Sequence, residues 1–375
     1  MNRRNLGLMA LALAATTGAA YAQAPVEVKI GHVAPLSGGQ AHYGKDNERG
    51  AVMAIEDLNA RKLTIGGKPV KFVLLSEDDG ADPKQGTAAA QKLVDAKVAG
   101  VVGHLNSGTT IPASKIYFDA GIPQITPAAT NPKYTQQGYK TAFRVIANDN
   151  ALGAATANYA TKTLKAKRVA IIDDRTAYGQ GVADIFEKVA KEGGAEVVTR
   201  QFTNDKATDF NAILTTVRGA KPEVIFYGGM DTQAGPMLRQ MKQLGINAKF
   251  MGGDGICTVE IAKLAGDAIG ENVICAEGGA SLAKMPKGAE FKNRFEAKYK
   301  EPIQVYAPYV YDAVMTLVAA MQKANSTDPA KYLPELAKLQ TEGVTAKISF
   351  DKTGELNNAS TTLYNYPGGK KTPLN

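Results

Sequence analysis

Several features that would mark particular classes of protein are scarce in this sequence. Only two cysteines, three histidines and no tryptophan occur in 375 residues. None of the histidines, His32, His42 and His104, stands at a metal-ligand spacing from the cysteines, which argues against a zinc site. No apolar run beyond the first two dozen residues approaches the ~20 residues that cross a bilayer. We therefore expect neither a metal centre nor a membrane span in the mature chain.

Blocks of like charge are also missing. The formal net charge is +8, but the lysines and arginines are scattered among aspartates and glutamates. A nucleic acid partner would require a concentrated basic surface, so we expect no such partner.

Signatures of common enzymes are absent as well. The sequence contains no G-x-S-x-G and no G-x-x-x-x-G-K-[ST], so neither a nucleophile elbow nor a P-loop is indicated. The pair Gly228-Gly229 lacks the spacing of a dinucleotide-binding loop. We interpret His104 as a structural histidine. The sequence thus predicts a protein that is not an enzyme and that needs no cofactor.

The N-terminus has the pattern of a secretory signal. A positive start is followed by an apolar run over residues 6–15 and by the A-x-A sequence at 20–22. We predict a signal peptide over residues 1–22, with cleavage after Ala22 favoured over cleavage after Ala24. A membrane anchor is disfavoured because the run is too short to span a bilayer. Without a cysteine nearby for a lipid anchor, we expect a soluble protein in the periplasm of a Gram-negative bacterium.

The two cysteines are Cys257 and Cys275. In an oxidising compartment an isolated pair is typical of one disulfide, and two buried thiols are the alternative.

Short apolar segments alternate along the chain with helical patterns. Segments rich in valine and isoleucine are typical of buried parallel strands; they occur at residues 26–30, 71–75, 100–102, 121–125, 143–146, 168–172, 196–198 and 223–227. Between them apolar residues recur at helical spacing, as at Val182, Phe186 and Val189. This alternation predicts an α/β protein with doubly wound parallel sheets. The chain length favours two of them, which we divide near residues 147–150.

Two loops that follow predicted strands have the composition of ligand sites. Residues 103–110 are small and rich in hydroxyl groups and precede a helix, whose N-terminal N–H groups favour an anion; ordinary helix capping is the alternative. Residues 125–132 contain two prolines, which hold the loop extended and expose backbone carbonyl groups. The alternative is an ordinary connection that contains prolines. Ligands of doubly wound sheets bind at the carboxyl ends of strands, so both loops are candidates.

A third loop, residues 250–255, places Asp254 between glycines after a strand pattern. A carboxylate in this place could hold an ammonium group. The alternative is a solvated turn, since Asp-Gly is a common turn pair.

Taken together, these loops resemble those of the Leu/Ile/Val-binding proteins of bacterial ABC transport. Other matching segments are Tyr43-Gly44, Asp78-Asp79, residues 82–85, Ala177-Tyr178-Gly179, Tyr227-Gly228-Gly229 and Phe250-Met251-Gly252. The matches occur in the family's order and cover nearly all of the mature chain. They imply the type I periplasmic-binding fold, in which two doubly wound parallel-sheet lobes are joined by three crossover segments. The first lobe would contain residues 26–146 and 278–352, and the second 147–277 and 353–375.

The resemblance also implies roles for individual residues. Ser107 and Thr130 would bind the ligand α-carboxylate, together with backbone N–H groups of the loop that contains Asn106. The carbonyl group of Leu105 or Ala128 would accept from the α-ammonium group, with Asp254 as its negative partner from the other lobe. The side-chain pocket would be lined by aromatic and apolar residues, namely Tyr43, Tyr178, Met230 and Tyr306. This division suits α-amino acids, which share a zwitterion and differ in the side chain.

Three departures from the family pattern matter. Well-known members have glutamate where Asp254 stands, and an aromatic residue where Met230 stands. Their disulfide lies elsewhere, at positions that align with Ala81 and Asn106. The first two departures leave the preferred ligand open.

The function implied by the resemblance is capture of a branched-chain or similar aliphatic amino acid for an ABC importer. The protein would be a monomer whose lobes close around the ligand and then dock on a permease in the inner membrane. Alternatives are a binding protein for an aromatic amino acid or an amide, a ligand sensor, or a periplasmic hydrolase. The hydrolase would need a nucleophile with a base in reach, and the sequence has no recognisable pair of that kind.

Overall fold

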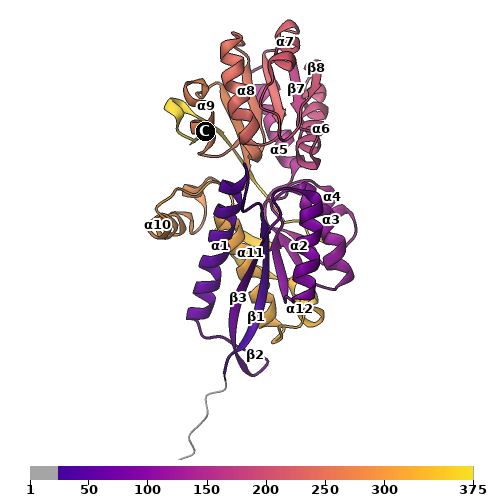
Figure 1. The fold of residues 1–375 in the computed structure, drawn as a ribbon, viewed down its shortest axis with the longest axis vertical. Helices are drawn as coiled ribbons and strands as arrows, with labels where there is room; N and C mark the ends of the chain where they lie inside the picture. Colours follow the sequence, from indigo (N-terminus) through magenta and orange to yellow (C-terminus); the bar gives the residue numbers. More distant parts are fainter. Residues whose placement is uncertain (1–23, 375) are drawn as a thin grey trace, which may run out of the picture.

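The computed structural model describes residues 24–374, so the predicted signal peptide over residues 1–22 lies outside the described residues. The chain forms two α/β lobes stacked along the long axis of the molecule (Figure 1). Each lobe has its own sheet with helices on both faces. The predicted architecture, an α/β protein with two parallel-sheet lobes, is confirmed.

The first lobe contains a six-stranded sheet in the order β2-β3-β1-β4-β5-β6, parallel except for the β2–β3 pair. Its strands are β1 (Val26–Ala34), β2 (Thr64–Ile65), β3 (Lys68–Asp78), β4 (Gly100–Gly103), β5 (Gln124–Thr126) and β6 (Ala142–Arg144). Its helices are α1 (Ala41–Ala60), α2 (Pro83–Asp95), α3 (Ser107–Asp119), α4 (Lys133–Gln136), α10 (Gly288–Tyr299), α11 (Ala307–Lys323) and α12 (Pro329–Leu336), and a small antiparallel pair, β12 (Gln340–Glu342) and β13 (Lys347–Ser349), completes the lobe.

Side chains that alternate along these strands build two separate cores. Val33 and Val101 pack with α2 and α3 on one face of the sheet. Ile30 and Val102 pack with α1 and α11 on the other face. Adjacent residues of a strand point to opposite faces, so a strand covered on both sides must be apolar throughout. This explains why the sequence reads as continuous apolar runs.

The second lobe contains a seven-stranded sheet in the order β15-β14-β11-β10-β9-β7-β8, parallel except for the β14 and β15 edge. Its strands are β7 (Arg168–Asp173), β8 (Glu196–Phe202), β9 (Val224–Gly228), β10 (Lys249–Gly252), β11 (Val273–Gly278), β14 (Thr361–Asn365) and β15 (Thr372–Pro373). Its helical segments include α5 (Asp149–Asn158), α6 (Ala177–Glu192), α7 (Asn211–Gly219), α8 (Asp231–Gln243), the short 3-10 turn η2 (Asp254–Ile256) and α9 (Ile261–Ala265).

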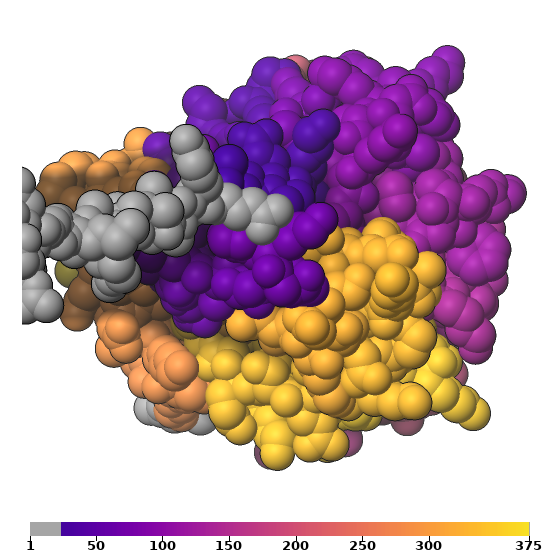
Figure 2. All heavy atoms as spheres, turned by 90° about the horizontal axis from the view of Figure 1, so that it is seen from below, coloured from indigo at the N-terminus to yellow at the C-terminus, as the bar shows by residue number. Residues whose placement is uncertain are grey.

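The chain crosses between the lobes three times. The first crossing follows β6, and the second follows β11 at Gly278. The third crossing comes later in the chain than the predicted boundary at residue 352. Residues beyond this boundary still bind the first lobe: Arg144 N donates to Gly354 O (2.9 Å), and Asn357 N donates to Ser349 O (2.9 Å). Seen from below, the segment beyond residue 300 lies beside the N-terminal segment on the lower lobe (Figure 2), so distant parts of the chain build one lobe.

The structure joins Cys257 and Cys275 in a disulfide, with their Cα atoms 5.4 Å apart. The bond ties the loop after η2 to β11, next to the turn that carries Asp254. Over residues 24–374, no helix combines the length and the apolar character that a membrane crossing requires.

Candidate ligand-binding site

The predicted site residues meet where the two lobes face each other. Nine of the ten line one interlobe cavity: Leu105, Asn106, Ser107, Ala128, Thr130, Tyr178, Met230, Asp254 and Tyr306. They follow the carboxyl ends of β4, β5, β7, β9 and β10, with only Tyr306 coming from the start of α11. Parallel strands bring their carboxyl ends to one edge of a sheet, so two facing sheets place all of these loops around the same space.

The cavity is narrow. It has about 220 Å³ of unfilled space, including open solvent, with room for only about one water molecule. Tyr306 on the first lobe donates through its hydroxyl to Asp254 Oδ2 on the second (3.0 Å). The lobes are therefore in contact around the cavity, and an amino acid could enter only if they separated.

Tyr43 is the predicted site residue that does not line the cavity. Its hydroxyl donates to Gly255 O (2.6 Å) and accepts from Asp231 N (3.3 Å), and both partners belong to the second lobe. Its ring lies 6.3 Å from that of Tyr306. Tyr43 thus joins the lobes behind the cavity wall instead of facing a ligand side chain.

The first loop is arranged at the N-terminus of α3. Asn106 precedes the helix and Ser107 is its first residue. Thr109 N and Thr110 N donate to Asn106 O (3.1 and 2.9 Å), whereas the N–H groups of Ser107 and Gly108 have no acceptor within the helix. The Asn106 amide donates to Gln40 Oε1 (2.8 Å), which fixes its orientation. The Ser107 hydroxyl accepts from Asn131 N (3.2 Å), which ties the two loops together. Free N–H groups and a hydroxyl in one place suit a carboxylate.

A buried arginine holds the second loop. Arg144 is fully buried, and its guanidinium donates to the carbonyl groups of Ala129 and Asn131 while pairing with Glu355. Arg144 was not among the site residues predicted from the sequence. Its only sequence signal is a charged residue at the end of an apolar strand, where a buried cation would need partners from elsewhere in the chain.

The second lobe contributes a carboxylate. Asp254 lies in η2 and is buried, and burial raises its pKa to about 6 although the neighbouring hydroxyl groups of Tyr178 and Tyr306 lower it. Tyr178 also accepts from Gly255 N (2.9 Å). A side chain at Gly255 would place its Cβ 2.6 Å from Gly229 O and 2.7 Å from the Tyr178 ring, so this close packing requires glycine.

Several buried acceptor atoms around the cavity have no hydrogen-bond partner among the described residues. Among the residues that line the cavity they are Asn106 Oδ1, Thr130 Oγ1 and Asp254 Oδ1. Buried acceptors normally have donors. Asn106 Oδ1 and Asp254 Oδ1 would suit a ligand that brings N–H donors and a positive charge, whereas the Thr130 hydroxyl can also donate to a carboxylate.

Asp149 is a second buried acidic residue, and it was not among the site residues predicted from the sequence. It is the first residue of α5, it is fully buried, and its backbone N–H donates to Thr130 O (2.9 Å). Burial first, and then the charge of Asp254, raise its pKa to about 8, although Thr130 and the charge of Arg144 lower it. The sequence signal was only an acidic residue in the first turn of a helix, which is common at any helix start.

His104 is buried, as expected of a structural histidine. Its Nδ1 lies 3.2 Å from Asp79 Oδ2 and its Nε2 lies 3.0 Å from the Tyr117 hydroxyl. In the described part of the chain, no three His, Cys, Asp or Glu side chains gather in a way that could hold a metal ion.

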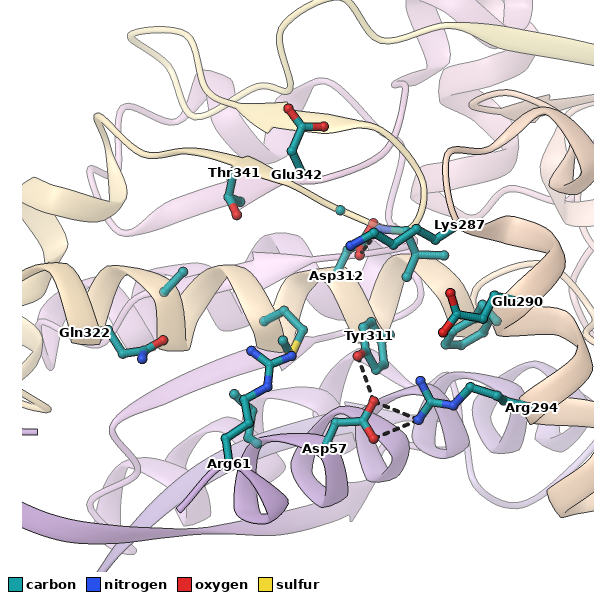
Figure 3. A pocket seen from close by; sticks show the side chains of 16 residues that line it. Asp57, Arg61, Lys287, Glu290, Arg294, Tyr311, Asp312, Gln322, Thr341 and Glu342 are labelled. Carbon is teal, nitrogen blue, oxygen red and sulfur yellow. Dashed lines mark hydrogen bonds and ion pairs between the residues drawn. The ribbon is translucent and has the colours of Figure 1, made fainter. Parts of the chain in front are cut away.

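A wider hollow lies within the first lobe, between α1, α10 and α11 (Figure 3). It has about 1200 Å³ of unfilled space, including open solvent. Its Asp57 accepts from Arg294 (2.7 Å) and from the Tyr311 hydroxyl (2.8 Å), as the dashed lines in Figure 3 show. Because only one lobe forms this hollow, lobe closure would not enclose a ligand there, and we favour the interlobe cavity.

Comparison with known proteins agrees with this geometry. The family model of the periplasmic binding proteins matches residues 27–370. The chain belongs to the periplasmic binding protein family. Curated Leu/Ile/Val-binding proteins also match over nearly the whole chain, so the predicted membership of the Leu/Ile/Val-binding protein family is confirmed.

Two relatives of this periplasmic binding protein come from Pseudomonas aeruginosa. One, an amino acid binding protein, is 37% identical over 96% of this chain and 95% of its own length. The other, a leucine-, isoleucine-, valine-, threonine- and alanine-binding protein, is 34% identical over 97% of this chain and 96% of its own length.

Solved structures show the same architecture. A leucine-binding protein from Thermotoga maritima has a TM-score of 0.85 and 28% identity, covering 93% of this chain and 98% of that one. The branched-chain amino acid transporter substrate-binding protein of Streptococcus pneumoniae, in complex with isoleucine, has a TM-score of 0.83 and 28% identity, covering 93% and 99%.

Proposed function

We propose that this protein captures a branched-chain or similar aliphatic amino acid for an ABC importer. The proposal is supported by two different sets of polar groups that face each other across one cavity. The first lobe presents hydroxyl and N–H groups at the start of α3, and the second presents the carboxylate of Asp254. These are the partners that the two charged ends of an α-amino acid require.

In this proposal each end of the zwitterion has its own partners. Ser107 and Thr130, with the N–H groups near them, bind the α-carboxylate. Asp254 and the carbonyl group of Leu105 or Ala128 bind the ammonium group. The names of the relatives, which include leucine, isoleucine, valine, threonine and alanine binding, support this class of ligand.

The ligand side chain would lie against Tyr178, Met230 and Tyr306, all of them buried at the cavity. Methionine is unbranched and has an adaptable side chain. Met230 can therefore move to admit side chains of different sizes, which supports a pocket for several aliphatic amino acids instead of one.

The setting of this function follows from the same proposal. The signal peptide over residues 1–22 directs the chain to the periplasm, where the protein acts as a monomer without a cofactor and without catalysis. Hinge motion at the three crossings closes the lobes over the amino acid. The closed form then docks on the permease in the inner membrane.

A thermal-shift screen of the mature protein against the twenty amino acids tests the proposal. A ligand at 100 times its dissociation constant stabilises the folded state by about 2.7 kcal/mol. We expect leucine, isoleucine or valine to give a clear rise in Tm, and calorimetric titration to give one site per chain. A response limited to aromatic amino acids or amides would move the protein to another ligand class, and a released product would make it an enzyme.

A further inference from the structure

A second polar contact joins the lobes next to the cavity. His42 lies in the first turn of α1 on the first lobe, and Asp231 is the first residue of α8 on the second. His42 Nε2 is 2.9 Å from Asp231 Oδ2, although the two residues are 189 positions apart in the sequence. The contact exists only while the lobes are together.

Asp231 needs a positive partner in this arrangement. Its side chain is fully buried, the Thr258 hydroxyl donates to the same Oδ2 at 2.6 Å, and Oδ1 has no partner among the described residues. Across residues 24–374, His42 is the only cationic side chain within ion-pair distance of Asp231. A buried carboxylate without a cation is costly, so a protonated His42 stabilises the joined lobes.

The surroundings of His42 favour its charged form. Burial lowers its pKa, but the hydrogen bond and charge of Asp231, the charge of Glu260 and the carbonyl group of Gly39 raise it, and the net pKa is above its ordinary value. The side chain keeps 20% of its surface exposed, so it can exchange protons with solvent. When the lobes part, Asp231 no longer acts on the ring and the pKa returns towards its ordinary value.

The contact also adjoins the binding site. The His42 ring lies against the ring of Tyr43, with centroids 4.2 Å apart and planes tilted by 37°, and Tyr43 accepts from the backbone N–H of Asp231. Tyr43 in turn donates to the carbonyl group of Gly255, directly after Asp254. His42, Tyr43 and Asp231 therefore form one connected set of contacts that closes the lobes behind the cavity.

We propose that His42 and Asp231 form an ion-pair latch that holds the lobes closed over the bound ligand, and that protonation of His42 strengthens it. The two residues position the lobes and do not touch the ligand. A histidine whose pKa is raised in the closed form contributes fully below its open-form pKa, and the contribution is lost as the pH rises through the closed-form pKa. Ligand release would thus be easier at higher pH.

The test compares the wild-type protein with His42→Gln, which keeps a neutral donor. The amino acid that gives the largest thermal shift is titrated by calorimetry between pH 6 and 8.5. We expect wild type to bind about three- to tenfold more tightly than His42→Gln at pH 6, with the ratio approaching one at pH 8.5. Taking the ratio removes the titration of Asp254 and Asp149, which both proteins share.

Two further variants make the test specific. The comparison is repeated in an Asp231→Asn background, with and without His42→Gln. The affinity ratio of these two proteins should not depend on pH, because the histidine then has no carboxylate to pair with. Lys45→Gln removes an exposed cation from the same helix and should leave the wild-type profile unchanged. A ratio that stays constant with pH overturns the latch.

A measurement without ligand separates this inference from the proposed function. Small-angle scattering compares the ligand-free wild type with His42→Gln at pH 6 and pH 8.5. At pH 6 the wild type should have the smaller radius of gyration, and at pH 8.5 the two proteins should have equal radii. If no amino acid binds, the proposed function falls and scattering alone decides: equal radii at both pH values overturn the latch.

Discussion

Replacing Asp254 by asparagine is the sharpest test of the binding mode. The variant keeps the size of the side chain and an oxygen that can accept from Tyr306, which donates to Oδ2 at 3.0 Å. It removes the negative charge and turns one acceptor into a donor, facing a place where Oδ1 has no partner among the described residues. The ligand ammonium group would then meet a donor instead of a carboxylate.

The magnitude follows from this loss. A hydrogen bond to a charged group contributes about 1.5–3 kcal/mol, more when it is buried. We therefore expect Asp254→Asn to weaken binding by at least ~2 kcal/mol, roughly thirtyfold in Kd. Ser107→Ala should cost less, because the N–H groups at the start of α3 remain to hold the carboxylate.

The pH dependence provides an independent check. Burial raises the pKa of Asp254 to about 6 in the ligand-free protein, despite the lowering effect of the tyrosine hydroxyl groups. Because the ammonium group requires the ionised form, wild-type affinity relative to Asp254→Asn should fall as the pH drops below 6. The ligand-free variant should be at least as stable as wild type at pH 7, since no charge has to be buried.

Calorimetric titration at pH 7.5 with leucine, isoleucine and valine decides the matter. Asp174→Asn is the matched control: Asp174 is also buried on the second lobe with a pKa raised to about 6 by burial, but it does not line the cavity. Near-native affinity of a folded Asp254→Asn protein would refute the reasoning, because the ammonium group would then be held elsewhere.

Other predictions concern the disulfide, Asp149 and salt. Thiol titration of the denatured, unreduced protein should find no free thiol, and replacing Cys257 and Cys275 by serine should cost about 3 kcal/mol of unfolding free energy in chemical denaturation. Asp149→Asn should gain stability relative to wild type as the pH rises from 5 to 8. Burial raises the pKa of Asp149 to about 8, so over this pH range the carboxyl group is ionised in the unfolded chain and must take up a proton when the protein folds. Chemical denaturation at both pH values measures the effect, and a constant difference between the two proteins would contradict it. Affinity for a zwitterion should vary little with salt, whereas a steep loss in titrations at rising salt would indicate a polyanionic partner.

Local sequence patterns were enough to predict the class of fold and three of the loops that meet at the cavity. Apolar runs such as residues 168–172 specify strands covered on both faces, and amphipathic patterns such as Val182 to Val189 specify the helices that cover them. Both signals are local, so they can be read without the rest of the chain. The loops after β4, β5 and β10 were identified for the same reason, since a strand followed by small or acidic residues is a local pattern.

Contacts between distant residues could not be predicted from local sequence patterns. Arg144 pairs with Glu355, 211 positions away, and this pair keeps the chain on the first lobe beyond residue 352. Tyr43 was expected beside the ligand but reaches across to Gly255, and His42 meets Asp231 from the opposite lobe. These contacts depend on how two separately folded lobes face each other. No periodicity within one segment encodes that arrangement, because burial and charge pairing across the cleft arise only when the three crossings bring the lobes together.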